Sequence, residues 1–439
     1  MERTDAMKLN LEPLSLDDGQ APPEEAATTG ILSISANGTS LTEGLSFDDE
    51  VLRAGPLVSA YPLAEWLAWN WWRLRWEPTP PQVNRHWAFA HRLSSVGGGH
   101  RWPNLELASD GERVRLFSAP SAEPCAGTFR YVGAPRSEAI TADAFESAVD
   151  AFVQVALDRL GKRLASASNL QTLTDSLDRD RADVGRNSFR RIEAMLGHDP
   201  GEGDAEAIRR LLADAPSLGE QAVFELAAGA TSVGAPALRE TLKRVGFDFR
   251  PQDGVTVDKV KPTTQWGTTA AWRVGVALAR QLREVELPNG RPVTNGRLAE
   301  MAGVPERALS DTGSTSDGLS FEWETAGQAR IALRSKWVTG RRFDLARLMA
   351  ERLLSRHRSE PLRAVTKSYT YRQKAQRAFA AEFLAPIDAV DAFLAGDCSE
   401  ERQTEAAQHF QISSYAIQSL LVNNRRLSRP GALDALDRM

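Results

Sequence analysis

The chain has 439 residues, of which 25% are charged, with a formal net charge of −5 and a pI of about 5.8. This length accommodates two or three domains, and the charge gives no overall attraction to nucleic acid or to an anionic membrane. Cys125 and Cys398 are the only cysteines, and no run of apolar residues is long enough for a signal peptide or a membrane span. We therefore expect a cytoplasmic protein without a disulfide framework, a Cys-based zinc site or a membrane segment.

The first 30 residues are expected to be mostly disordered or extended. Residues 15–29 are polar, acidic and Pro-bearing, which is the composition of a linker or of a boundary between ordered and disordered chain. We therefore place the start of the first domain after residue 30.

Residues 31–165 are expected to form a small α+β domain. A segment that alternates apolar and polar residues is centred on Asn37-Gly38, a dipeptide that predicts a β-hairpin. Residues 141–164 have the apolar spacing of a long amphipathic helix, and Thr141 stands at its N-cap position. Another helix is expected at about residues 63–76.

Tryptophan is concentrated in this domain, with seven of the eleven Trp between residues 66 and 102. On a helix, four of them form one stripe: Trp66, Trp69, Trp72 and Trp76. In one interpretation, which we favour, the stripe packs in the core. In the other, the cluster binds a partner or stacks on nucleic-acid bases, since Trp and Arg are enriched in binding hot spots. The candidate binding residues are Trp71, Trp72, Arg73 and Arg75, and Trp71 is the strongest because it points away from the stripe.

Residues 166–250 carry only helical signals and are expected to form an all-helical connector. A Pro- and Thr-containing stretch ends this connector and marks the boundary to a C-terminal domain at residues 262–430. The fold class expected for the whole chain is therefore α+β and mostly helical.

Two segments of the C-terminal domain carry the most specific pattern. Residues 341–354 read RRFDLARLMAERLL, and residues 378–386 read AFAAEFLAP. These segments resemble the ImmA/IrrE family of zinc metallo-endopeptidases, whose two motifs run approximately R-R-F-T-L-A-H-E-L-G-H-Y-L-L and E-x-E-A-N-x-F-A-A-E-L-L-M-P. The resemblance implies a zincin-like, minimal metallopeptidase fold for this domain.

The positions that would bind zinc depart from the family pattern. Such a site needs two His one helical turn apart, with a Glu between them that accepts a proton from the metal-bound water. The two His positions are Arg347 and Glu351 here, the catalytic Glu position is Leu348, and the third-ligand position is Ala375. We therefore expect no catalytic residue, no metal and no cofactor at this site, and an exposed i, i+4 ion pair between Arg347 and Glu351.

The C-terminal end has the outline of a helix-turn-helix over residues 405–427. Its second helix begins with Ser413, Ser414 and Tyr415, whereas recognition helices place base-reading and phosphate-binding residues in their first turns. We therefore expect this segment to pack on the domain core rather than to bind DNA. The residues expected to pack are Phe410, Ile412, Ile417, Leu420 and Leu421.

Three functions remain open. The first is a non-catalytic ImmA/IrrE-like protein that binds a protein partner, such as a helix-turn-helix regulator or a defence-system component, as the resemblance implies. The second is a nucleic-acid-associated regulator that uses the Trp- and Arg-rich N-terminal domain. The third is an active hydrolase with a non-standard site. We expect the first, with a protein partner, no membrane association and no enzymatic activity.

Overall fold

A computed structural model describes most of the chain. The described residues are 5–14, 21–122, 127–230, 233–250, 254, 266–287, 291–325, 328–355 and 360–428. Cys125 and residues 262–265, at the start of the expected C-terminal domain, lie outside these ranges. The chain is 53% helix and 17% strand, an α+β mixture with several small antiparallel sheets. No helix among the described residues has the length and apolar character needed to span a membrane.

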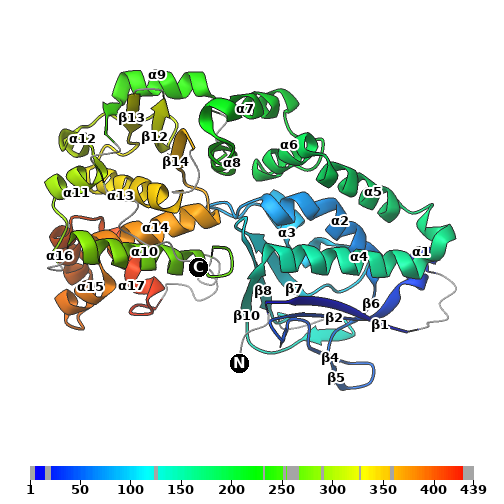
Figure 1. Ribbon diagram of the computed structural model, residues 1–439. Coiled ribbons are helices and arrows are strands. Elements are labelled where there is room, and N and C mark those ends of the chain that lie inside the picture. Colours follow the sequence, from blue (N-terminus) through cyan, green and yellow to red (C-terminus); the bar gives the residue numbers. More distant parts are fainter. Residues whose placement is uncertain are drawn as a thin grey trace. The chain divides into compact units, whose positions relative to one another are not determined.

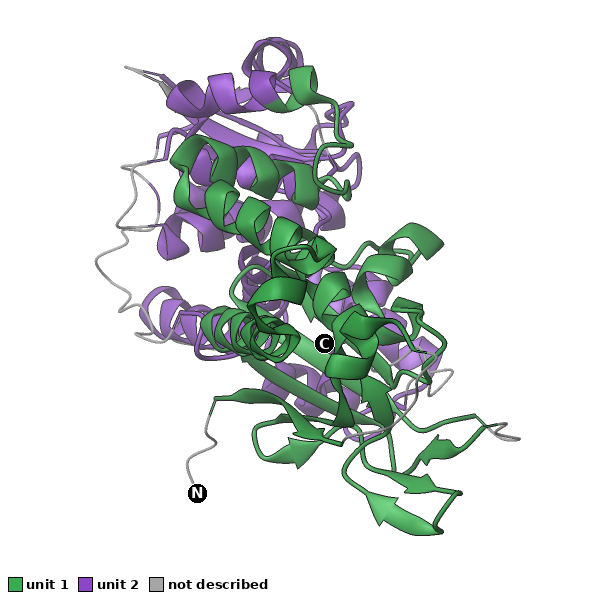
Figure 2. Cartoon of the chain, turned by 90° about the vertical axis from the view of Figure 1, so that its right-hand side faces the viewer, with its two compact units in different colours: residues 1–208 green, residues 209–439 purple. Residues whose placement is uncertain are grey.

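The chain divides into two compact units, residues 1–208 and residues 209–439 (Figure 2). The division falls inside helix α7 (Ala205–Leu218), and therefore inside the connector expected at residues 166–250. Each unit has its own sheets and its own buried apolar cluster. The expected connector is helical over most of its length, but its last residues form a strand of the second unit.

Unit 1 contains three small antiparallel sheets, with orders β1-β2-β3 (β6 also pairs with β2), β10-β8-β7 and β5-β4-β9 (Figure 1). Their strands are β1 (Met7–Pro13), β2 (Thr29–Ala36), β3 (Thr39–Ser40), β4 (Gly44–Ser46), β5 (Val51–Arg53), β6 (Leu57–Ser59), β7 (Asn104–Ser109), β8 (Arg113–Ala119), β9 (Phe129–Tyr131) and β10 (Arg136–Thr141). The expected hairpin at Asn37-Gly38 is confirmed: these two residues connect β2 to β3, and both have positive φ, 52° and 79°.

The N-terminal segment differs from our expectation for residues 1–30. Strand β1 pairs with β2 along its whole length, from Met7 opposite Ala36 to Pro13 opposite Gly30. The alternation of apolar and polar residues in β1 is that of a strand with one face on the core. Residues 7–13 are therefore part of the first sheet and not a separate segment.

The helices of unit 1 pack against the sheets and against one another. They are α1 (Pro23–Ala27), α2 (Ala60–Trp76), α3 (Arg85–His91), α4 (Ala142–Ala165), α5 (Asn169–Ala182) and α6 (Val184–Met195), with a short 3-10 turn, η1 (Leu93–Ser95). The expected long helix is α4, and the Thr141 side chain accepts a hydrogen bond from the Ala144 amide as its N-cap. Its residues Phe145, Val149 and Phe152 are buried in the core together with α2.

Unit 2 is built on one antiparallel sheet with strand order β11-β13-β12-β14 (Figure 1). The strands are β11 (Phe247–Asp248), β12 (Ser320–Thr325), β13 (Gln328–Ala332) and β14 (Leu362–Val365). The helices are α8 (Glu220–Ala228), α9 (Ala235–Val245), α10 (Ala271–Glu286), α11 (Asn295–Ala302), α12 (Arg307–Ser310), α13 (Val338–Leu354), α14 (Tyr371–Leu384), α15 (Ile387–Leu394), α16 (Glu400–Phe410) and α17 (Ser414–Asn423).

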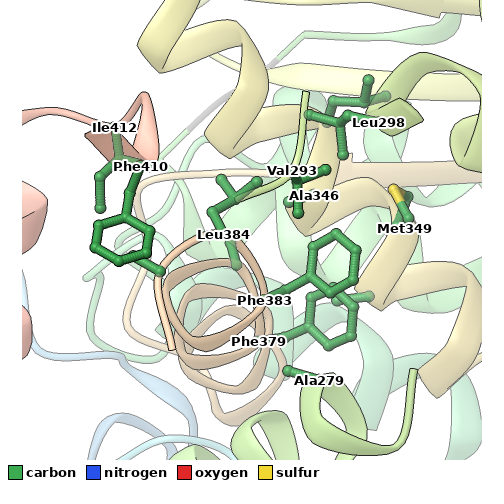
Figure 3. Close-up of a cluster of buried hydrophobic side chains, with 14 of the residues drawn as sticks. Ala279, Val293, Leu298, Ala346, Met349, Phe379, Phe383, Leu384, Phe410 and Ile412 are labelled. Carbon is green, nitrogen blue, oxygen red and sulfur yellow. The ribbon is translucent and has the colours of Figure 1, made fainter. Parts of the chain in front are cut away.

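Helices α13 and α14 lie in the middle of the core of unit 2. Phe379 and Phe383 stack with their ring centroids 5.3 Å apart, and Ala346 and Met349 belong to the same buried cluster (Figure 3). The C-terminal helices α16 and α17 pack on this cluster, which confirms the expected packing of that segment. The five expected residues are all buried there: Phe410, Ile412, Ile417, Leu420 and Leu421.

Candidate functional site

The two motifs lie on α13 and α14. Their apolar residues are core residues: Leu345, Ala346 and Leu353 of α13, and Phe379, Ala380 and Leu384 of α14, are buried in one cluster. Helix α14 begins at a defined point because the Thr370 hydroxyl accepts a hydrogen bond from the Gln373 amide. The core therefore fixes which polar side chains of the two helices face each other.

Arg347, at the first His position of the motif, is buried and only 2% exposed. Its Nη2 donates to the main-chain oxygen of Thr366 at 2.9 Å and to Gln373 Oε1 at 2.6 Å. Gln373 is held in turn, since its Oε1 accepts from the Thr366 amide and its Nε2 donates to the Ala364 oxygen. Both acceptors of Arg347 are uncharged, and burial lowers its pKa well below the usual value.

Glu351, at the second His position, is also buried and 5% exposed. Its Oε1 accepts hydrogen bonds from Arg372 Nη1 and from the Ser355 hydroxyl, each at 2.6 Å. Its Oε2 accepts from Gln376 Nε2 at 2.7 Å. The exposed ion pair expected between Arg347 and Glu351 is therefore wrong. The two residues share a helix face, but α14 covers that face and gives each of them its own partners.

Leu348 and Ala375, the remaining motif positions, are both fully buried among apolar groups. Leu348 belongs to the main core cluster, and Ala375 packs with Ala271, Val274 and Tyr371 in a second cluster. The α14 side chains that reach Arg347 and Glu351 come instead from positions 372, 373 and 376. Ala375, at the third-ligand position, therefore makes no side-chain hydrogen bond to Arg347 or Glu351, whereas Arg372, Gln373 and Gln376 do.

These residues do not fit a zinc ion. A guanidinium has no lone pair to donate to a metal, and both carboxylate oxygens of Glu351 already accept hydrogen bonds. Among the residues that the structure describes, no group of three or more His, Cys, Asp or Glu is placed to hold a metal ion. The site is instead a network of hydrogen bonds between the side chains of α13 and α14.

A second buried carboxylate, Glu225 of α8, extends the network. Its Oε2 accepts a hydrogen bond from the Thr370 hydroxyl at 2.9 Å. Burial raises the pKa of Glu225, and the negative charge of Glu351 adds to this effect, whereas the positive charge of Arg372 opposes it. Glu225, Glu351 and Arg372 are therefore electrostatically coupled, so that each depends on the charge of the others.

The four candidate binding residues of unit 1, Trp71, Trp72, Arg73 and Arg75, are buried. Trp71 and Trp72 are each 3% exposed and meet edge to face. Arg73 pairs with Glu77 at 2.7 Å and with Asp199 at 2.9 Å, and Arg75 pairs with Glu146 at 2.5 Å. These four side chains were the candidate residues for binding a partner or nucleic acid, although core packing of the Trp stripe was the favoured interpretation. Because they are enclosed, they offer no stacking surface, and Trp71 in particular belongs to the core.

The exposed aromatic residues are different ones, which the sequence analysis did not select. In unit 2 they are Trp337, 78% exposed, Tyr415, 73% exposed, and Trp272, 51% exposed. In unit 1, Phe89 is 64% exposed, Trp69 of the expected core stripe is 46% exposed, and Phe47 is 42% exposed. The position of Trp337, next to Lys336 and directly before the first motif, is the only sequence signal that distinguishes it.

Comparison of the chain with models of protein families, with curated proteins and with solved structures finds no match.

Proposed function

We propose that this chain is a non-catalytic, ImmA/IrrE-like protein that acts by binding a protein partner, as a regulatory, defence or stress-response component. The proposal is carried by one observation, that two motif residues of α13 are buried and hydrogen-bonded to side chains of α14. Arg347 and Glu351 occupy the His positions of the motif, and both are engaged by α14 in a buried network. A site built in this way keeps the helices together but has neither a metal ligand set nor a free general base.

An exposed aromatic residue at the start of α13 supports partner binding. Trp337 is the N-cap residue of α13, and its side chain is 78% exposed. Tryptophan is among the residues that are enriched in binding hot spots. Trp337 is therefore the residue that we expect to contact the partner.

The proposal is tested by affinity purification of the tagged full chain from its host. The wild-type chain and a Phe89→Ala variant, which removes an exposed aromatic residue of unit 1, should recover the same partner protein. A Trp337→Ala variant should recover much less of it, while keeping the melting temperature of the wild type, because an exposed side chain contributes little to stability.

The same experiment separates the three candidate functions. The partner should be recovered intact and also after nuclease treatment. Recovery of the partner as defined cleavage fragments that appear only with the wild-type chain would indicate an active hydrolase. Loss of the partner on nuclease treatment would indicate the nucleic-acid-associated function instead.

A further inference from the structure

Arg347 is a buried cation that forms no ion pair with the described residues. Only its Nη2 donates to them, and both acceptors are neutral oxygens. Its Nε is buried and has no hydrogen-bond partner among the described residues. A buried charge without a counter-charge is costly, and arginine stays protonated, so this arrangement calls for an anion.

Arg342, another buried arginine of α13, has hydrogen-bond acceptors for all three of its side-chain nitrogens. Its Nε donates to the Gln411 oxygen at 3.0 Å, and its Nη1 and Nη2 donate to Asn295 Oδ1 and to the Val293 oxygen, each at 2.5 Å. All three nitrogens of Arg342 are thus occupied. Arg347 leaves donors free, and the two arginines are only five residues apart.

Two further guanidinium groups lie near Arg347. Arg334 binds Asp344, one helical turn before Arg347 on α13, and Arg377 donates to the main-chain oxygen of Ser368, two residues after the Thr366 oxygen that accepts from Arg347. Burial is the main cause that lowers the pKa of Arg347 and of Arg377, and the charges of Arg334 and Arg377 lower the pKa of Arg347 further. Arg377 lies over the Tyr369 ring, 4.8 Å from its centroid, and donates to the Ser368 oxygen at 2.7 Å. Arg334 and Arg377 are both partly exposed, so the cluster of Arg334, Arg347 and Arg377 reaches the surface.

The charges of this arginine cluster do not cancel. Arg334 makes two hydrogen bonds to Asp344, each at 3.0 Å, which offsets its charge. Arg347 and Arg377 donate to neutral oxygens. The charges of Asp344 and Glu225 also act on Arg347. The three guanidinium groups therefore carry more positive charge than these two carboxylates offset, which suits an oxyanion with several acceptor oxygens.

We propose that Arg334, Arg347 and Arg377 form a binding site for a phosphate group, carried by inorganic phosphate or by a small phosphomonoester. A phosphate group carries a charge of about −1.5 to −2 at neutral pH and has several acceptor oxygens. Guanidinium groups bind such oxyanions through paired, charge-assisted hydrogen bonds. This inference does not depend on the proposed function, since it uses only the side chains of this cluster.

The test is calorimetric titration and thermal unfolding of the full chain with inorganic phosphate, glycerol 3-phosphate and acetate, at an ionic strength matched with potassium chloride. Phosphate should bind and raise the melting temperature with increasing concentration, as a ligand of the folded state does. Acetate, a monoanion, should bind at least about tenfold more weakly. A lower Kd for glycerol 3-phosphate would identify a phosphomonoester as the ligand, and a lower Kd for inorganic phosphate would identify the free ion.

Variants locate the site. Arg377→Gln, at a half-buried position, should raise the Kd for phosphate by about tenfold or more. Arg347→Gln should have at least the same effect if the variant folds. Arg426→Gln, which removes an exposed arginine far along the chain, should leave the Kd unchanged. Absence of phosphate binding, equal affinity for acetate, or an unchanged Kd in Arg377→Gln would each overturn the proposal.

Discussion

Arg372 and Glu351 form a buried ion pair between α14 and α13, with Arg372 Nη1 2.6 Å from Glu351 Oε1 and both side chains less than one-tenth exposed. Because Ser355 and Gln376 also donate to Glu351, its carboxylate is fully hydrogen-bonded. The pair thus joins the two helices at the place where the motif of the resembled family would hold a metal.

The first prediction concerns this pair. Arg372→Met should lower the free energy of unfolding by about 3–5 kcal/mol, because it leaves the Glu351 carboxylate buried without its cation. Urea denaturation measures the loss. Arg426→Met, which breaks an exposed ion pair with Asp391, is the matched control and should change the stability little.

Arg347→Met provides a comparison within the same network. It leaves only neutral acceptors unpaired and should cost about 1–3 kcal/mol, less than Arg372→Met. If Arg372→Met were no more destabilising than the exposed control, the buried pair would not hold the helices together.

The second prediction is a pH dependence set by Glu225. Its pKa is raised in the folded state, mainly by burial, so the folded chain keeps a proton that the unfolded chain loses above a pKa of about 4.5. The stability that this group contributes is present at low pH and is lost as the pH rises toward the folded pKa. Glu225→Gln, which mimics the protonated side chain, should therefore gain stability relative to the wild type over this range.

Thermal unfolding of both proteins from pH 5 to pH 8 measures this difference. The two curves of melting temperature against pH should diverge as the pH rises. Parallel curves would show that Glu225 has an ordinary pKa in the folded chain.

The third prediction tests the close approach of α10 and α14. A Cβ atom added at Gly275 would lie 2.1 Å from the main-chain oxygen of Ala375, which cannot move aside without displacing the helix. Gly275→Ala should therefore destabilise the chain by about 1–3 kcal/mol. Gly185→Ala is the control, since the nearest atom lies at 3.5 Å on an exposed part of α6 and alanine favours helix, so this change should stabilise slightly. Equal effects of the two changes would contradict the packing of α10 on α14.

The fourth prediction concerns DNA. Since the apolar residues of α16 and α17 are buried in the core, we expect the chain to bind duplex DNA only nonspecifically, with a Kd of about 10⁻⁴ to 10⁻⁶ M at physiological salt. A fluorescence titration with several duplex sequences measures this. Nanomolar, sequence-dependent binding that is lost on combined Arg425→Ala and Arg426→Ala substitution would show instead that the end of α17 recognises DNA.

Local patterns predicted much of the secondary structure. The helix expected at residues 141–164 is α4, Ala142–Ala165, because an N-cap and a regular apolar spacing are both encoded locally. Inside it, Gly161 has a φ of 66°, which breaks the helical geometry at a residue that the apolar spacing does not mark. Strand β1 was not predicted, because the acidic, Pro-bearing residues that follow it suggested that the whole segment up to residue 30 is disordered or extended.

The candidate site was predicted less well. Helical spacing correctly places Arg347 and Glu351 on one face, but it does not tell whether that face is exposed. The residues that cover it, Arg372, Gln373 and Gln376, are selected by how α14 packs on α13, which depends on tertiary structure. For the same reason Trp71 was taken as a surface residue although α2 is enclosed around most of its circumference.

The zinc content of the purified full chain tests the central claim most directly. A network of arginine, glutamate and glutamine side chains stands at the motif positions that would bind zinc in the family that the two motifs resemble. After dialysis against EDTA and buffer exchange, elemental analysis should find far less than stoichiometric zinc, also when zinc is added back and the excess removed. A content near stoichiometric zinc after either treatment would contradict the account.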